Sequence, residues 1–158
     1  MKSMNRKLTE CVVTVGRIGH LPYAPGTFGS LVGLIGGGAL ILSCPHFYVW
    51  IAIGVVLGLG AVFIPRYLND HPTKKDPSEI VIDEVLGQLI ALTVCETFFE
   101  LGLAFVLFRI LDIAKPWPIS WADRLEGSPV KNTVGILLDD MIAGALVVPT
   151  LWYVRSFY

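Results

Sequence analysis

Five apolar segments, two of them accompanied by pairs of adjacent acidic residues, constrain this chain more than any other feature. The segments cover residues 31–42, 47–64, 85–95, 98–110 and 134–152. Asp83 and Glu84 directly precede the third segment, and Asp139 and Asp140 lie inside the fifth. An ionised carboxylate in apolar surroundings is costly unless it is paired, bound to a metal or facing a water-filled cavity. The acidic pairs are therefore candidate functional residues.

The lengths of the segments indicate an all-α membrane protein. A spanning helix needs about 20 residues. The segments over residues 47–64 and 134–152 reach this length by themselves. Those over residues 31–42 and 85–95 reach it if their helices begin near Thr27 and near Pro77. Hydrophobic residues make up 54% of the chain and charged residues 16%, whereas soluble domains average about 45–50% and about 25%. The sequence predicts one domain over residues 1–158, a polytopic bundle of about four to five membrane-embedded helices that follows a polar segment over residues 1–16.

Capping signals divide the third and fourth segments into separate helices. Asp76 is a good N-cap, Pro77 suits the first helical position, and Glu79 falls at the capping-box position. Thr97 and Glu100 repeat the capping-box pattern before the fourth segment. We therefore expect one helix to begin at each of these signals.

The distribution of Lys and Arg predicts the orientation in the membrane. Positive residues gather in the N-terminal segment and in the loops over residues 66–78 and 115–133. The alternate loops, over residues 43–46 and near Glu96, carry none, and only Arg155 lies on their side. With five spans, the positive segments all fall on one face, which the positive-inside rule makes cytoplasmic.

Glycines at four-residue intervals predict close contacts between helices. Gly29, Gly33 and Gly37 form GxxxG steps, as do Gly54 and Gly58. Small residues let membrane helices approach closely. The alternative is a glycine-rich core helix whose packing is only loosely specified.

Most of the remaining ionisable residues converge on the cytoplasmic ends of three predicted helices. They are Glu79, Asp83 and Glu84 on the third, Arg109, Asp112 and Lys115 on the fourth, and Asp139 and Asp140 on the fifth. Glu79 and Asp83 are four residues apart, so they would share a helix face. Carboxylate oxygens suit Mg²⁺, and Arg and Lys beside the metal suit a phosphate group. The pattern predicts metal-assisted phosphoryl chemistry.

Roles for these residues follow from their chemistry. The candidate metal ligands are Glu79, Asp83, Glu84, Asp139 and Asp140, and the candidate catalytic carboxylates are Asp83, Glu84, Asp112, Asp139 and Asp140. The candidate phosphate-binding cations are Arg109, Lys115 and Arg124. Thr27 and Ser30, in a glycine-containing stretch before an apolar helix, would add hydroxyl groups and backbone N–H groups. The alternatives are acids that only pair with cations to hold the bundle together, and an ordinary helix cap at Thr27 and Ser30.

Other chemistries have weaker support. Cys11 and Arg17 have the C-x5-R spacing of cysteine-dependent phosphatases, but the intervening β-branched residues oppose a phosphate-cradling loop. The net charge of −1 gives no basic surface for nucleic acid. The three cysteines are scattered and suggest neither a disulfide framework nor a zinc site.

Four sequence blocks, in order, carry a resemblance to a known family. They cover residues 25–30 (PGTFGS), 80–87 (IVIDEVLG), 108–119 (FRILDIAKPWPI) and 135–144 (GILLDDMIAG). Together they resemble phosphatidylglycerophosphatase A. The connector over residues 127–133 departs from the resemblance, because the family would be expected to have more glycine there.

The resemblance implies a Mg²⁺-dependent lipid phosphatase of the bacterial inner membrane, a multi-pass protein with its active site on the cytoplasmic side. Its phospholipid substrate would be phosphatidylglycerophosphate, which loses its terminal phosphate to give phosphatidylglycerol. The family's two acidic motifs fall on Asp83 with Glu84 and on Asp139 with Asp140, and its basic motif falls on Arg109, Asp112 and Lys115. The sequence leaves the oligomeric state open.

Two other functional interpretations remain at this stage. The same carboxylates would also serve a membrane protein that binds or transports a cation. A soluble helical phosphatase with an unusually apolar core is the third interpretation.

Overall fold

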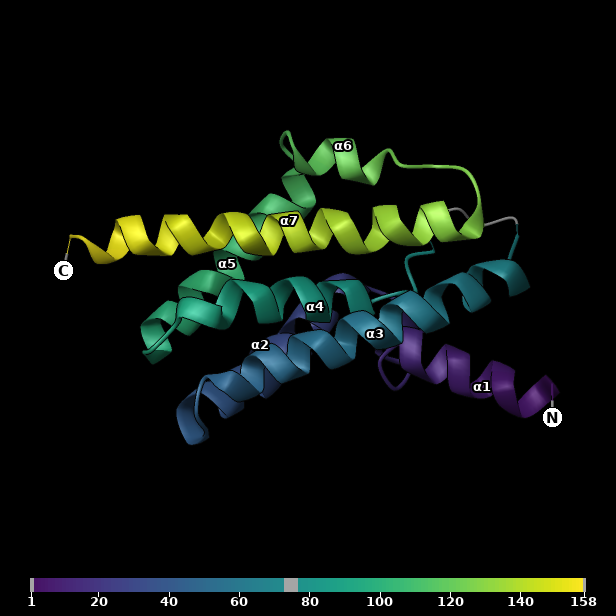
Figure 1. Ribbon diagram of the computed structural model, residues 1–158, viewed down its shortest axis with the longest axis horizontal. Coiled ribbons are helices and arrows are strands. Elements are labelled where there is room, and N and C mark those ends of the chain that lie inside the picture. Colours follow the sequence, from purple (N-terminus) through teal and green to yellow (C-terminus); the bar gives the residue numbers. More distant parts are fainter. Residues whose placement is uncertain (1, 73–76, 158) are drawn as a thin grey trace.

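The protein is a bundle of helices aligned roughly along one long axis, with the chain termini at opposite ends (Figure 1). The computed structural model describes residues 2–72 and 77–157. The helices, in order, are α1 (Lys2–Val13), η1 (Ile18–His20), α2 (Pro25–Ser43), α3 (Phe47–Asp70), α4 (Ile82–Ala91), η2 (Leu92–Val94), α5 (Phe98–Ala114), α6 (Ile119–Asp123) and α7 (Pro129–Arg155). The described residues contain no strand, which confirms the all-α prediction.

In residues 2–72 and 77–157, three helices, α2, α3 and α7, are long and apolar enough to cross a membrane, judged by length and composition. The helix that was expected to begin near Pro77 is shorter than predicted, because α4 begins at Ile82. The preceding residues form a turn, in which the Ile80 N–H donates to the Pro77 carbonyl and the Val81 N–H donates to the Val13 carbonyl at the end of α1, 3.0 Å away. These hydrogen bonds replace helical ones. The expected cap at Asp76 lies outside the described residues.

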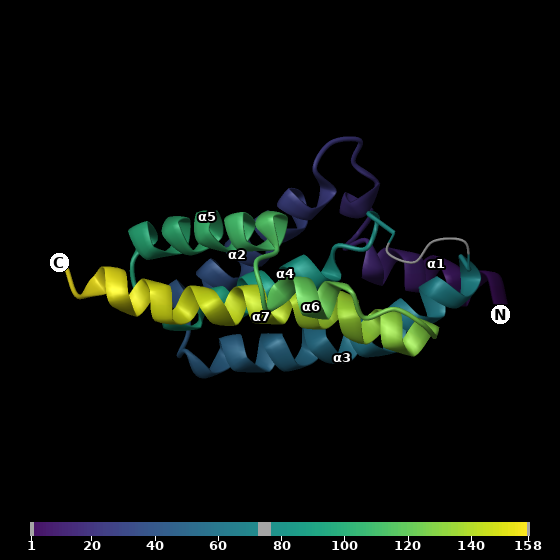
Figure 2. The same ribbon diagram turned by 90° about the horizontal axis from the view of Figure 1, so that it is seen from above.

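Helix α4 is the centre of the bundle. Eight of its ten residues are buried, and it packs against α2, α3, α5 and α7. Seen from above, α3 and α5 lie on opposite sides of α7 (Figure 2). The side chains at the start of α4 are therefore enclosed by several helices and exposed to little solvent.

Glycines bring α2 against α4. A Cβ atom on Gly29, Gly33 or Gly37 would come closer to α4 or η2 than van der Waals contact allows. This confirms the predicted close packing for these three residues. The expectation fails within the described part of the chain for Gly54 and Gly58 of α3, because nothing described lies within 4 Å of either Cβ position.

A second glycine contact joins α4 to α7 next to the acidic residues. A Cβ on Gly87 would lie 2.6 Å from the Asp140 carbonyl oxygen, and a Cβ on Gly144 would overlap the Gly87 carbonyl. The two backbones therefore touch, and this contact fixes the depth at which the carboxylates of α7 meet those of α4.

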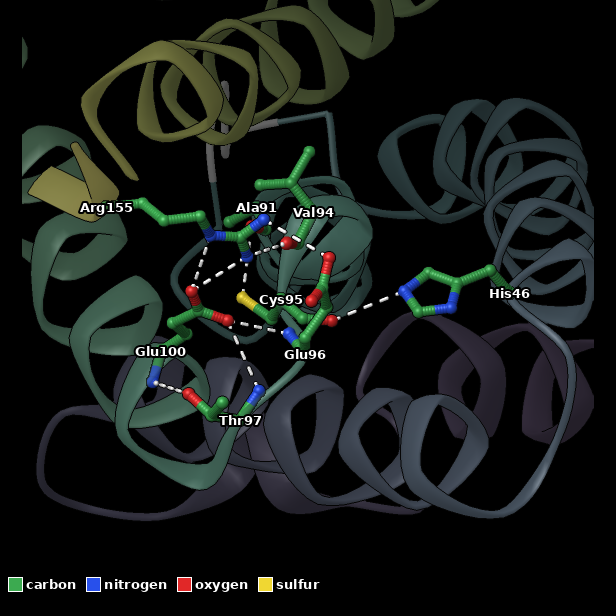
Figure 3. A network of polar contacts seen from close by, with 8 residues as sticks. All are labelled: His46, Ala91, Val94, Cys95, Glu96, Thr97, Glu100 and Arg155. Atoms are coloured by element: carbon green, nitrogen blue, oxygen red, sulfur yellow. Dashed lines mark hydrogen bonds and ion pairs between the residues drawn. The ribbon is translucent and has the colours of Figure 1, made fainter. Parts of the chain in front are cut away.

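At the end of the bundle far from these acids, Arg155 ties α7 to α5 (Figure 3). The Arg155 guanidinium donates to Glu100 Oε1 at 2.8 Å, to Glu96 Oε1 at 3.2 Å and to the Val94 carbonyl at 2.7 Å. Glu100 also completes the predicted capping box with Thr97. The few charges of this end thus pair with one another.

Candidate active site

Three carboxylates from two helices meet near the start of α4. Asp83 and Glu84 lie in the first turn of α4, and Asp140 lies on α7. Each offers one carboxylate oxygen, and these oxygens all lie within 4.8 Å of one another. Asp83 and Asp140 are only 8% and 3% exposed. Asp83 Oδ1 and Glu84 Oε2 are buried and have no hydrogen-bond partner within the described part of the chain.

Helix α5 adds a fourth carboxylate and an arginine. Arg109 Nη1 donates to Asp112 Oδ2 at 2.5 Å, and the two residues are three apart, on one face of α5. Asp112 also interacts electrostatically with Glu84 and Asp140. The predicted Arg109–Asp112 pair therefore lies directly beside the acidic cluster.

The start of α2 closes the other side of the site. Ser30 Oγ donates to the Gly26 carbonyl at 2.9 Å and accepts a hydrogen bond from Arg109 Nη1 at 3.1 Å. A Cβ on Gly26 would overlap the Glu84 carboxylate. Ser30 thus positions Arg109. Thr27 is half-buried and lines an apolar groove together with Arg109.

Lys115 forms a second charged group next to the cluster. Its ammonium donates to Asp139 Oδ2 at 2.7 Å and to Asp123 of α6. Burial lowers the pKa of Lys115, but the hydrogen bonds with Asp123 and Asp139 outweigh it and raise the pKa above its ordinary value. Asp139 Oδ1 in turn accepts a hydrogen bond from the Asp140 N–H at 3.0 Å. The Asp139 carboxylate is therefore paired with Lys115, while the Asp140 carboxylate lies near those of Asp83 and Glu84.

Two predicted site residues lie elsewhere. Glu79 was expected on one helix face with Asp83, but it lies in the turn before α4, where its carbonyl is packed against Gly19. It is absent from the carboxylate cluster found among the described residues. Arg124 is exposed directly after α6, and within the described ranges no ion pair joins it to the acids.

Sequence reasoning missed Asp123 and Gln88 near the site, and it assigned Gly26 only to a candidate phosphate-binding stretch. Asp123 holds Lys115, and Gly26 makes room for the Glu84 carboxylate. Gln88 is fully buried one turn after Glu84, and neither of its amide atoms has a hydrogen-bond partner among the described residues. A polar amide inside an apolar segment was a signal that could have identified Gln88. No comparable signal in the sequence identifies Asp123 as a residue near the site.

The alternative site at Cys11 is contradicted by the structure. Cys11 lies inside α1. The N–H groups of Thr14, Gly16 and Arg17 all donate to atoms of the same segment, so they are engaged and cannot cradle a phosphate.

The donor set fits a divalent cation. Among the described residues, the carboxylates of Asp83, Glu84, Asp112, Asp139 and Asp140 lie beside two cations, Arg109 and Lys115, and Lys115 also pairs with Asp123. Buried negative charge requires compensation, and hard oxygen donors are what Mg²⁺ prefers. The buried carboxylate oxygens without partners point in the same direction.

The fold and the site together define a class: a helical membrane protein with a buried carboxylate cluster beside an arginine and a lysine. Comparison with known proteins then places the chain within that class. The family model for phosphatidylglycerophosphatase A matches residues 11–155, and the chain belongs to this family. Enzymes of this family are phosphatases acting on a phosphate monoester, and so is this one.

Curated relatives agree with this assignment. The chain is 35% identical to "Phosphatidylglycerophosphatase A" of Escherichia coli, over 86% of this chain and 77% of the relative. It is 33% identical to the Haemophilus influenzae protein of the same name, over 84% of this chain and 79% of the relative. A Bacteroides thetaiotaomicron protein named "Putative phosphatidylinositol-3-phosphatase" is 31% identical, over 80% of each chain. No solved structure gives a significant match.

Proposed function

We propose that this protein is a Mg²⁺-dependent lipid phosphatase that hydrolyses the terminal phosphate monoester of phosphatidylglycerophosphate, giving phosphatidylglycerol and phosphate. The observation that carries the proposal is the meeting of Asp83, Glu84 and Asp140 oxygens within 4.8 Å of one another in a bundle whose long helices have the length and composition to span a membrane. The names of the Escherichia coli and Haemophilus influenzae relatives support the choice of lipid.

Asp83, Glu84 and Asp140 would hold the metal, with Asp112 as the nearest further carboxylate. When bound, Mg²⁺ supplies positive charge that neutralises phosphate oxygens and favours ionisation of water. Asp139 has a different role in this arrangement, because its carboxylate already accepts a hydrogen bond from Lys115.

The protein's own residues bind and orient the phosphate. Arg109 Nε is buried without a hydrogen-bond partner among the described residues, so this donor is available to a phosphate oxygen. Lys115 stays protonated because its pKa is raised, and it adds a second positive charge. Charge-assisted hydrogen bonds of this kind are stronger than neutral ones.

Hydrolysis also requires proton transfer. A water molecule attacks phosphorus, the bond to the headgroup glycerol oxygen breaks, and a carboxylate oxygen of the cluster accepts the proton of the water. The leaving oxygen takes up a proton and becomes the free hydroxyl of phosphatidylglycerol. Packing of α2, α5 and α7 around the start of α4 limits bulk water at this position.

We place the enzyme in the bacterial inner membrane, with the active site on the cytoplasmic side. The charge distribution of the loops supports this orientation. Trp117 and Trp121, between α5 and α6 and within α6, are 81% and 56% exposed. Exposed indoles suit the headgroup region of a bilayer, so they support an interface at this end of the bundle.

The decisive experiment measures phosphate release by the purified protein in detergent. The substrates are phosphatidylglycerophosphate, phosphatidic acid and phosphatidylinositol 3-phosphate, each with and without Mg²⁺. The third lipid is included because of the name of the Bacteroides relative. We expect the first lipid to be preferred and the activity to disappear when Mg²⁺ is chelated.

Matched substitutions test the cluster. Asp83→Asn and Asp140→Asn should each lower kcat/KM by about 10²-fold or more, because each removes a charge from the predicted metal site. Asp70→Asn is the control, since Asp70 is a partly exposed residue at the end of α3 paired with Arg6. Undiminished phosphate release by both cluster variants would refute the proposed site. Cation flux into vesicles without phosphate release would favour the transporter interpretation.

A further inference from the structure

Two apolar hollows lie along α2 and α5, and we treat them as the near and far parts of one groove, of which the near part includes Arg109. Its near part has a volume of about 470 Å³ and is lined by Thr27, Phe105, Val106, Arg109, Ile110 and neighbouring residues of α5. Its far part, about 310 Å³, is lined by Leu34, Ile35, Gly38 and Ala39 of α2 and by Phe98, Leu101 and Gly102 of α5, among others. Both parts lie between the same two helices, and we refer to them together as the α2–α5 groove.

Small side chains produce the far part of the groove. Nothing lies within 4 Å of the Cβ position of Gly102, so this position is open. Gly38 is buried, and its Cβ would lie 3.3 Å from Leu101, so a larger residue there would crowd α5. In the near part, Val106 and Ile110 are 50% and 57% exposed. The walls are therefore apolar and face outward, toward the surrounding lipid of a membrane.

Arg109 connects this groove to the acidic cluster. Its side chain lines the near part of the groove, while its guanidinium contacts Ser30 and Asp112 inside the bundle. It is the only charged residue in either lining as the structure describes them. A molecule that occupies the groove thus meets apolar side chains for most of its length and one positive charge, that of Arg109, in the near part.

The chemistry of this surface matches one occupant, a lipid with a phosphate headgroup. We propose that the α2–α5 groove seats one acyl chain of the substrate lipid and guides its phosphate to Arg109. The inference rests on the proposed function and extends it by naming the surface that receives the lipid.

The dimensions are consistent with an acyl chain. From Thr27 to Leu42, α2 advances by about 22 Å at 1.5 Å per residue, whereas one leaflet occupies about half of a 30 Å hydrocarbon core. The near part runs along α5 from Phe105 to Ala114, about 14 Å at 1.5 Å per residue, so it alone covers most of one leaflet. Because lipid tails are as apolar as the groove, burial there provides little net affinity. The groove would instead orient the lipid, so its effect should appear in kcat/KM for long chains.

Two pairs of variants test this inference. Val106→Trp fills the near part and Gly102→Trp fills the far part of the groove. Val55→Trp and Gly54→Trp are the matched controls, because Val55 is 55% exposed and nothing lies near the Cβ position of Gly54, both on α3. Helix α3 lies on the opposite side of α7 from α5 (Figure 2). The substrates are phosphatidylglycerophosphates with two hexanoyl, two decanoyl or two oleoyl chains.

We expect the ratio of kcat/KM for the oleoyl lipid to that for the hexanoyl lipid to fall at least tenfold in both groove variants. Gly102→Trp should leave the ratio for decanoyl to hexanoyl lipid closer to wild type than Val106→Trp does. The α3 controls should leave both ratios unchanged. The inference would be overturned if the groove and control variants changed these kcat/KM ratios equally. It would also be overturned if neither groove variant changed them.

A binding measurement separates this inference from the proposed function. Phosphatidic acid with a diazirine in its acyl chain is photolysed with the wild-type protein in nanodiscs, and labelled peptides are identified by mass spectrometry. Labelling concentrated on α2 and α5 supports the groove even if no lipid phosphate is hydrolysed. Uniform labelling of α2, α3 and α5 overturns it, whether or not the enzyme is active.

Discussion

Gly26→Ala provides a sharp test of the site, because it adds one methyl group between α2 and Glu84. The new Cβ would lie 3.1 Å from Glu84 Cδ and 3.5 Å from Arg109 Nη1, and it would overlap Glu84 Oε1. The carboxylate must retreat by about 1 Å to regain van der Waals separation. The backbone does not need to move, since the atom displaced is the end of a flexible side chain.

The expected magnitudes follow from this geometry. A misplacement of about 1 Å in a reacting group costs about 10²-fold in rate, so kcat/KM should fall by about that factor. Stability should change by less than about 1 kcal/mol, below the usual 1–3 kcal/mol for overpacking. If Glu84 is a metal ligand, the Mg²⁺ concentration for half-maximal activity should also rise.

Gly36→Ala is the matched control on the same helix. Nothing lies within 4 Å of its Cβ position, and replacing a mid-helix glycine by alanine typically gains about 0.5–1 kcal/mol. The assay compares phosphate release across a Mg²⁺ titration with thermal unfolding in detergent. Wild-type activity and Mg²⁺ dependence in Gly26→Ala would refute the placement of Glu84 at the metal site.

Three further predictions concern other parts of the structure. Lys115→Met should lower the thermal midpoint in detergent equally at about pH 8 and about pH 9: a raised pKa means that the pairs with Asp123 and Asp139 stabilise the fold fully below the ordinary lysine value of about 10.4 and are lost only as the pH rises through the raised value. A difference that vanished between those two pH values would contradict this assignment. Gln88→Leu should raise the free energy of unfolding by about 1–3 kcal/mol, because it removes a buried amide that has no partner among the described residues. Chemical unfolding measures this change, and a lower free energy of unfolding would show that the amide has a partner in the folded protein. Arg155→Met should lower the thermal midpoint without changing KM, because it removes the cation that pairs with the buried Glu100 carboxylate (Figure 3), far from the site; an unchanged midpoint would argue against the contact.

The sequence by itself determined the class of fold and most of the residues that lie at the candidate site. Apolar segments of near-spanning length can satisfy their backbone in a membrane only as helices or closed barrels, and their lengths favoured helices. Local signals placed some boundaries correctly, such as the capping box of Thr97 and Glu100. Carboxylates in apolar surroundings marked Asp83, Glu84 and Asp140 as functional candidates, because such charges persist only with compensation.

Only the tertiary structure decided which candidates meet. Asp139 and Asp140 are neighbours in sequence, yet adjacent helical residues point about 100° apart. The contact of Gly87 with α7 turns Asp140 toward α4, and the Asp139 carboxylate then faces Lys115 and accepts its hydrogen bond. Likewise, the hydrogen bond from Val81 to Val13 delays the start of α4 and separates Glu79 from Asp83. Helical periodicity fixes the relative directions of side chains on one helix, whereas the side that faces a neighbour is chosen by packing between helices.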